Sequence, residues 1–231
     1  NYTYDAIGNL LTRTDGAGTY SYAGTNYAHP HAVTSIGSIN YAYDNNGNML
    51  TETSGLSNTW DYNNRLTQAV KGGITSTYAY DHTSERVKMG NGTTTNYYPT
   101  KYYNTNGTTP TKSIYAGDVL VATIKGTGAG AVVYSEHSDH LNSTNVTTDS
   151  SGVQMELLDY FPFGNSRISS GSYTSQKKYL GKEYDPDTAL NYLNARYYSS
   201  SIGKFLSQDP AYLALGNEKQ LKEITRLDIK K

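Results

Sequence analysis

The chain has 231 residues, with 19 basic and 20 acidic side chains, a formal net charge of −1 and no cysteine. This balance gives no electrostatic footprint for nucleic acid, and the lack of cysteine excludes a disulfide framework and a thiolate metal site. No apolar run approaches the roughly 20 residues of a membrane-spanning helix. Leu, Ile, Val and Phe are scarce, and 24 tyrosines supply apolar surface in their place, which favours half-buried strands.

Residues 1–125 carry a short repeat. Tyr4-Asp5-x-x-Gly8 recurs as Tyr43-Asp44-x-x-Gly47, and partial copies begin at Tyr80-Asp81 and at Tyr62. Counting worn copies, the anchor tyrosines recur about every 19 residues, at Tyr4, Tyr22, Tyr43, Tyr62, Tyr80 and Tyr98. This period is too short for a pair of helices and suits two short strands joined by turns.

The residues around each anchor indicate a β-hairpin. Alternating runs such as Tyr2-Thr3-Tyr4 place both aromatic rings on one face of a strand. The Asp that follows starts a turn through its own side chain, and Gly supplies a positive φ. A single hairpin cannot bury its apolar face, so we predict an all-β fold in which stacked antiparallel hairpins form one curved sheet.

The composition changes after the repeats. Gly126–Gly130 is either a flexible joint or the tip of a hairpin, and residues 126–213 form a second region. In residues 214–231, Leu221, Ile224 and Leu227 have helical spacing, which predicts a short amphipathic helix that packs on the sheet.

These residues resemble the Rhs/YD-repeat proteins, which include bacterial toxin-complex subunits and teneurins. The Tyr-Asp-x-x-Gly-Asn-Leu repeat matches the YD repeat of that family. The second region resembles the Rhs-associated core, with motifs in the expected order at Tyr134–Thr144, Tyr160–Gly164, Gly181–Asp185, Leu190–Tyr192, Ala195–Tyr198 and Gly203–Pro210. The resemblance therefore extends over nearly the whole chain.

The resemblance implies a structural role in a bacterial protein that is secreted or displayed on the cell surface. In that family the repeats wind into a hollow shell, the core closes one end as a plug, and a C-terminal toxin or effector follows inside. We therefore expect domains at 1–125 (YD repeats), 126–213 (core) and 214–231 (helical tail), and no cofactor. The chain begins at Asn1 rather than Met, so we expect a fragment or a processed product.

An enzymatic alternative rests on Asp185 and Asp209. The resemblance implies that two Asp residues at these motif positions act together in self-cleaving cores, with the cut after Leu213. Two close carboxylates can share a proton, which is the chemistry of an aspartic protease. Tyr212 stands where the family has Gly, and Asp-Pro pairs also start ordinary turns. We therefore expect a protein that is structural rather than enzymatic.

Two further binding hypotheses come from side-chain types. His137, Asp139 and His140 are possible metal ligands, but three well-placed ligands are not evident, so we expect no metal, and a structural role for Asp139 and His140. The many Tyr, Asn, Thr and Ser residues suit carbohydrate binding or self-assembly at a cell surface. Tyrosines at period two more often form ladders that stabilise a sheet.

The partner hypothesis concerns the first strand. The chain opens in Asn1–Tyr4, already a strand, with no Lys or Pro nearby to block its edge. We predict that this edge pairs with upstream repeats or with a neighbouring subunit. The C-terminal core and helix would cap the other end of the array.

Overall fold

The computed structural model describes residues 1–16, 18–23 and 29–210, and these form an almost entirely antiparallel β structure. The strands are β1 (Tyr2–Tyr4), β2 (Leu10–Arg13), β3 (Tyr20–Tyr22), β4 (Val33–Ile36), β5 (Ile39–Tyr43), β6 (Met49–Glu52), β7 (Ser57–Trp60), β8 (Leu66–Lys71), β9 (Ile74–Tyr80), β10 (Arg86–Gly90), β11 (Thr95–Thr100), β12 (Tyr103–Thr105), β13 (Pro110–Ala116), β14 (Val119–Lys125), β15 (Val132–Ser138), β16 (Thr144–Thr148), β17 (Gln154–Tyr160), β18 (Ser166–Gly171), β19 (Glu183–Asp185), β20 (Leu190–Tyr192), β21 (Tyr197–Ser199) and β22 (Lys204–Phe205). Two short 3₁₀ turns are η1 (Gly128–Gly130) and η2 (Tyr179–Gly181). The predicted all-β, antiparallel, curved architecture is confirmed, and the expected helix at Leu221, Ile224 and Leu227 lies outside the described residues.

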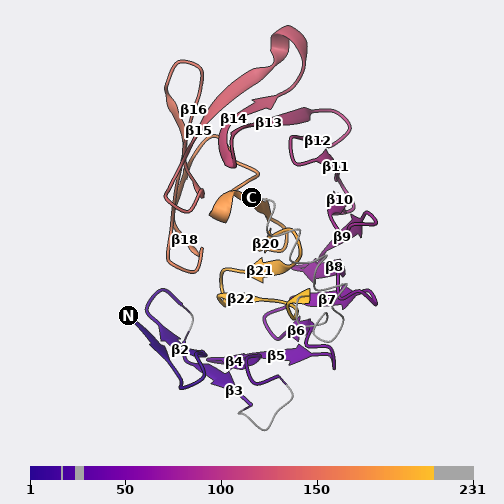
Figure 1. Cartoon of the computed structure of the whole chain (residues 1–231), viewed down its shortest axis with the longest axis vertical. Helices are drawn as coiled ribbons and strands as arrows, with labels where there is room; N and C mark the ends of the chain where they lie inside the picture. The colour runs from indigo at the N-terminus through magenta and orange to yellow at the C-terminus, as the bar shows by residue number, and fades with distance from the viewer. Residues whose placement is uncertain (17, 24–28, 211–231) are drawn as a thin grey trace.

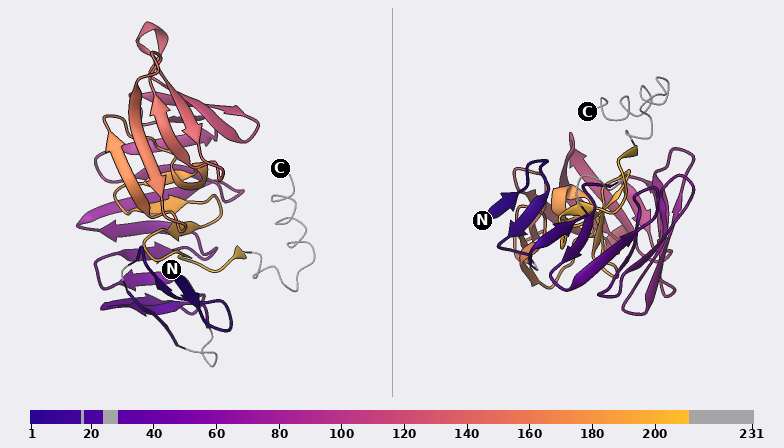
Figure 2. Two further views of the ribbon diagram at one scale, coloured as in Figure 1. Left: turned by 90° about the vertical axis from the view of Figure 1, so that its left-hand side faces the viewer. Right: turned by 90° about the horizontal axis from the view of Figure 1, so that it is seen from below.

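One sheet dominates the molecule. Its 16 strands run in chain order from β3 to β18, and each strand pairs with its sequence neighbours. We call this sheet the strip. It curves from β3–β5, past β7–β10, to β13–β16 and back to β18 (Figure 1). The four-stranded sheet β19–β22, which we call the plug, lies inside this curve (Figures 1 and 2).

The end of the strip returns to the start of the chain. Phe163, in the turn between β17 and β18, packs its ring 5.6 Å from that of Tyr2, measured between centroids. The guanidinium of Arg13 lies 5.3 Å from the same ring. β1 and β2 form a separate two-stranded hairpin beside the strip. The strip therefore makes about one coil around the plug.

The concave face of the strip changes character along the chain. In the first half it is apolar, and fully buried Leu66 belongs to one cluster with Leu190, Tyr197 and Leu206 from the plug region. In the second half most buried residues are polar, among them Thr111, Thr123, Glu136, Thr147 and Glu156, and the buried apolar residues of its strands are Leu120 and Leu158. The hydrophobic core thus holds the plug against β2–β10. Beyond β10, hydrogen bonds make the contacts on the concave face.

The glycine-rich segment Gly126–Gly130 is the tip of the hairpin that joins β14 to β15, and it contains η1. The hairpin alternative is therefore the right one, because β14 and β15 pair directly across it. The strip continues without a break across the expected domain boundary at residue 126, up to Gly171. Among the described residues, no helix is long and apolar enough to cross a membrane.

Candidate functional site

The Tyr-Asp turn is the unit from which the strip is built. One carboxylate oxygen of Asp44 accepts the backbone N–H groups of Asn46 and Asn48, both at 2.9 Å. Gly47 donates its N–H to the Asp44 carbonyl and has a φ of 79°, which Gly adopts without strain. The same carboxylate geometry recurs at Asp5, Asp61, Asp81, Asp139 and Asp149.

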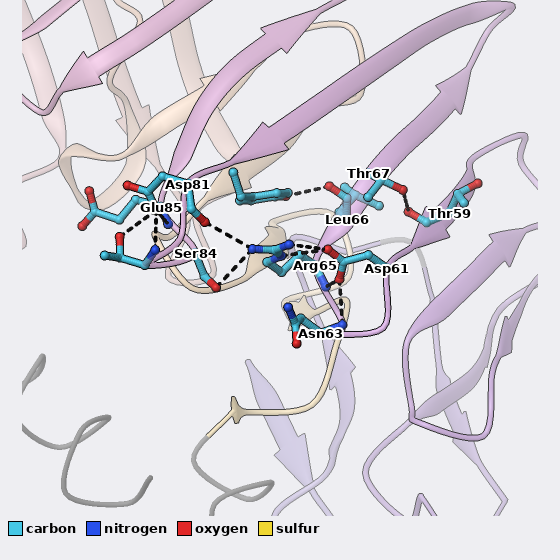
Figure 3. A network of polar contacts seen from close by, with 11 residues as sticks. Thr59, Asp61, Asn63, Arg65, Leu66, Thr67, Asp81, Ser84 and Glu85 are labelled. Atoms are coloured by element: carbon cyan, nitrogen blue, oxygen red, sulfur yellow. Dashed lines mark hydrogen bonds and ion pairs between the residues drawn. The ribbon is translucent and has the colours of Figure 1, made fainter.

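Successive turns are linked along one edge of the strip (Figure 3). The Arg65 side chain pairs with Asp61 in its own turn at 2.8 Å. Its Nη1 also reaches the next turn, 3.3 Å from the Ser84 hydroxyl and 3.4 Å from the Asp81 carbonyl. Hydrogen bonds from the Thr83 hydroxyl and from backbone N–H groups lower the pKa of Asp81. The turns are therefore an ordered, charged framework.

Partly buried aromatic side chains anchor five strands of the strip, each to the strand before it. The Tyr80 hydroxyl donates to the Leu66 carbonyl at 2.6 Å. Burial raises the pKa of Tyr80, so the hydroxyl stays protonated and able to donate. The same type of bond joins Tyr22 to Leu10, Tyr43 to Val33, Trp60 to Met49 and Tyr160 to Thr144. These bonds satisfy the polar group that each partly buried ring carries.

The structure corrects one anchor of the repeat. Tyrosine spacing predicts Tyr62 as the fourth anchor, but Tyr62 is 90% exposed. Trp60 ends β7 in that position, and Asp61 makes the turn. The indole N–H of Trp60 donates to the Met49 carbonyl at 2.8 Å, so it replaces a tyrosine hydroxyl.

A buried ion pair links the strip to the plug. Arg86, at the start of β10, is 4% exposed, and its Nη1 lies 2.6 Å from the Asp185 carboxylate and 3.2 Å from the Tyr197 hydroxyl. Its guanidinium carbon lies 4.6 to 5.9 Å from four tyrosine centroids, those of Tyr78, Tyr98, Tyr192 and Tyr197. Burial raises the pKa of the Asp185 carboxyl, and the charge of Arg86 opposes that rise. We call this cluster the Arg86 node.

The two candidate catalytic carboxylates are engaged by different arginines. Asp185 belongs to the Arg86 node and is 2% exposed. Asp209 forms an ion pair with Arg196 at 2.6 Å, and 38% of its side chain is exposed. Leu213, the expected cleavage position, lies outside the described residues. The catalytic pair therefore stays a prediction.

The histidine motif is part of a turn. His137 is in β15, with Nε2 3.4 Å from the Thr148 hydroxyl. Asp139 caps the following turn through the N–H groups of Leu141 and Ser143, both at 2.8 Å. Within residues 1–16, 18–23 and 29–210, no three His, Cys, Asp or Glu side chains are grouped so that they could hold a metal.

Two buried glutamates that the sequence analysis did not single out lie on the concave face of the strip, and one of them holds the segment between strip and plug. Glu156 accepts the Ser175 N–H at 2.8 Å, and Glu136 accepts the Thr147 hydroxyl at 2.9 Å. Thr147 is the direct cross-strand neighbour of both. Burial raises the pKa of Glu136. Their only signal in the sequence is a charged residue within a strand.

A strip of stacked hairpins coiled around a plug defines a β-shell segment. The chain belongs to the Teneurin YD-shell family, whose model matches residues 1–227. It is 33% identical to the tRNA3(Ser)-specific nuclease WapA of Bacillus spizizenii over 90% of this chain and 9% of the relative. It is 28% identical to toxin subunit YenC1 of Yersinia entomophaga, over 91% of this chain and 26% of that protein.

Solved structures share the fold. The crystal structure of TcdB2-TccC3 aligns with a TM-score of 0.65 and 18% identity, and the match covers 91% of this chain and 14% of that one. The chain therefore spans a small part of the relatives and structures that it matches. The family and the fold support a mainly structural role, as a segment of a toxin-like shell.

Proposed function

We propose that the chain is a wall-and-plug segment of a secreted or cell-surface shell that encloses or presents a C-terminal effector. The observation that carries the proposal is the path of the chain after β18. It turns to the concave side of the strip and forms the plug there, held by the hydrophobic cluster and by the Arg86 node. The relatives named as a nuclease and as a toxin subunit are consistent with such a cargo.

The test uses the natural polypeptide that contains residues 1–231. Electron microscopy of the purified particles, combined with limited proteolysis, should show a closed hollow particle. It should also show a segment after residue 231 that the protease cuts only once denaturant has opened the shell. An open strip, a following segment that is cut as fast as an unfolded chain, or no following segment would contradict enclosure.

Self-cleavage is the second candidate, supported by the motif positions of Asp185 and Asp209. Such a site needs two carboxylates that share a proton, so Asp209 would have to leave Arg196 and approach Asp185. A polypeptide extended beyond Lys231 should then be cut after Leu213, and Asp209→Asn should keep it whole. The intact mass of the extended wild-type polypeptide decides the question, because an uncut chain rejects the protease.

Association through the first strand is a further part of the proposal. Among the described residues, β1 pairs only with β2, so its outer edge is open to another strand. β18 ends the strip on the other side, and all six of its residues are exposed. Light scattering should therefore show association, and replacing Tyr2 and Tyr4 with Pro should abolish it. A stable monomer with a freely exchanging first strand would reject the pairing.

A further inference from the structure

A half-open pocket of about 490 Å³ lies between the strip and the plug region. Strands β10–β14 form one wall, and residues 174–178 and 184–187 form the other. We call it the Asn104 pocket, after a residue in its strip wall. Its volume falls in the range of about 300–1,000 Å³ that is typical of ligand sites. The strip wall is the concave face, so an occupant would approach from inside the coil.

Two polar side chains in this wall make no side-chain hydrogen bond with any residue that the structure describes. Asn104, in β12, is 5% exposed, and its amide makes no hydrogen bond within the part of the chain that the structure describes. Thr111, its direct cross-strand neighbour in β13, is 7% exposed, and its hydroxyl is equally unpaired among the described residues. Both residues line the pocket, and neither polar group is among the buried atoms that lack a partner, so each faces the pocket space and can bond to water or to an occupant.

Asn104 and Thr111 form a row across β12 and β13, and Lys125 continues this row on β14. It is the cross-strand partner of Thr111 in β14, and it also lines the pocket. Its ammonium lies 4.3 Å from the Tyr173 ring centroid and forms no ion pair with any described residue. Burial lowers its pKa. The row therefore presents an amide, a hydroxyl and an ammonium, which together offer several donors and two kinds of acceptor.

We propose that the Asn104 pocket binds an extended polypeptide segment through the main-chain carbonyl and amide groups of that segment. A side-chain amide matches a peptide group in both donor and acceptor, and the lysine adds a donor for a carbonyl oxygen. Sugar ligands are disfavoured because both rings that line the pocket already carry a cation. Arg86 lies 4.8 Å from the Tyr98 centroid, and Lys178 lies 5.0 Å from that of Tyr184. The inference rests on the proposed function, in which an enclosed chain meets this concave face.

The test is an NMR titration of the ¹⁵N-labelled chain with a capped, neutral glycine–serine hexapeptide. The side-chain amide signal of Asn104 should shift and saturate. Asn104→Leu should weaken binding at least about tenfold, the loss expected when roughly 1.4 kcal/mol of interaction is removed. Thr111→Val, which removes only the hydroxyl, should also weaken it. Asn40→Leu, at an exposed position of β5, is the matched control and should bind as the wild type does.

Thermal unfolding separates a ligand site from a structural one. Asn104→Leu should keep or raise the Tm, because no hydrogen bond within the fold is lost. The proposal is overturned by a marked fall in Tm, by binding that is unchanged in both pocket variants, or by the absence of a saturable shift. Saturation by maltotriose in place of the peptide would identify a carbohydrate site and would also overturn it. A natural polypeptide that encloses nothing, while the peptide still binds, rejects the proposed function alone.

Discussion

Replacing Arg86 should be the most damaging single change at the boundary of strip and plug. Arg86→Met keeps the apolar stem but removes the cation that pairs with Asp185 at 2.6 Å. Removal of one partner from a buried ion pair costs about 3–5 kcal/mol, because the other charge stays buried. That is a large part of a typical stability of about 5–15 kcal/mol. Urea unfolding at pH 7, followed by circular dichroism, measures the loss directly.

The loss should depend on pH. Burial already raises the pKa of Asp185, and without Arg86 it should rise further. A carboxyl whose pKa is higher in the folded state than in the unfolded state contributes most to the free energy of unfolding below its unfolded pKa, about 3.9. That contribution is lost as the pH rises through the pKa of the folded state. The deficit of Arg86→Met should therefore grow from acid to neutral pH.

A double variant provides the control for the Arg86 node. Arg86→Met combined with Asp185→Leu removes both charges and should recover most of the lost stability. The reason is that a buried ion pair often stabilises a fold no more than apolar side chains of similar volume do. A deficit under about 1 kcal/mol at pH 7, or strictly additive losses in the double variant, would refute the reasoning.

Three smaller changes test the repeat itself. Tyr80→Phe removes a part-buried hydrogen bond of 2.6 Å and should cost about 1 kcal/mol in urea unfolding, whereas Tyr62→Phe, at a residue that is 90% exposed, should cost nothing measurable. Gly152→Ala places a side chain at φ 79° and should cost about 1 kcal/mol, but Gly130→Ala, where φ is not positive, should not destabilise. Asp81→Asn should destabilise at neutral pH only. Hydrogen bonds hold the pKa of Asp81 below its usual value, so its contribution is present above about pH 3.9 and is lost as the pH falls through the folded pKa.

Local turn chemistry explains why the repeats could be predicted from the sequence. Asp5 and Asp44 cap their own turns within four residues, so the pattern and the structure coincide. Tyr62 is the exception, because it fits the tyrosine spacing but lies after the turn Asp rather than at the end of the strand before it. Trp60 performs the same task with its indole N–H, and Asn64, with a φ of 58°, takes the place of the turn glycine. The Asp and the left-handed turn position therefore mark the phase of the repeat better than the tyrosine does.

The contacts that assemble the coil could not be predicted in the same way. Arg86 and Asp185 are 99 residues apart, and no short-range pattern states that they meet. The row of Asn104, Thr111 and Lys125 exists only through the register of β12–β14. Motif resemblance brought Asp185 and Asp209 together as a pair, but it gave no sign that each would be held by its own arginine.

The central claim is that one strip coils around its own plug, and NMR of the aromatic rings tests it most directly. The ring centroids of Tyr78 and Tyr197 are 5.0 Å apart, and those of Tyr2 and Phe163 are 5.6 Å apart. We predict nuclear Overhauser contacts within both pairs in the isolated chain. Contacts limited to neighbouring strands, with neither long-range pair observed, would contradict the coil and the plug together.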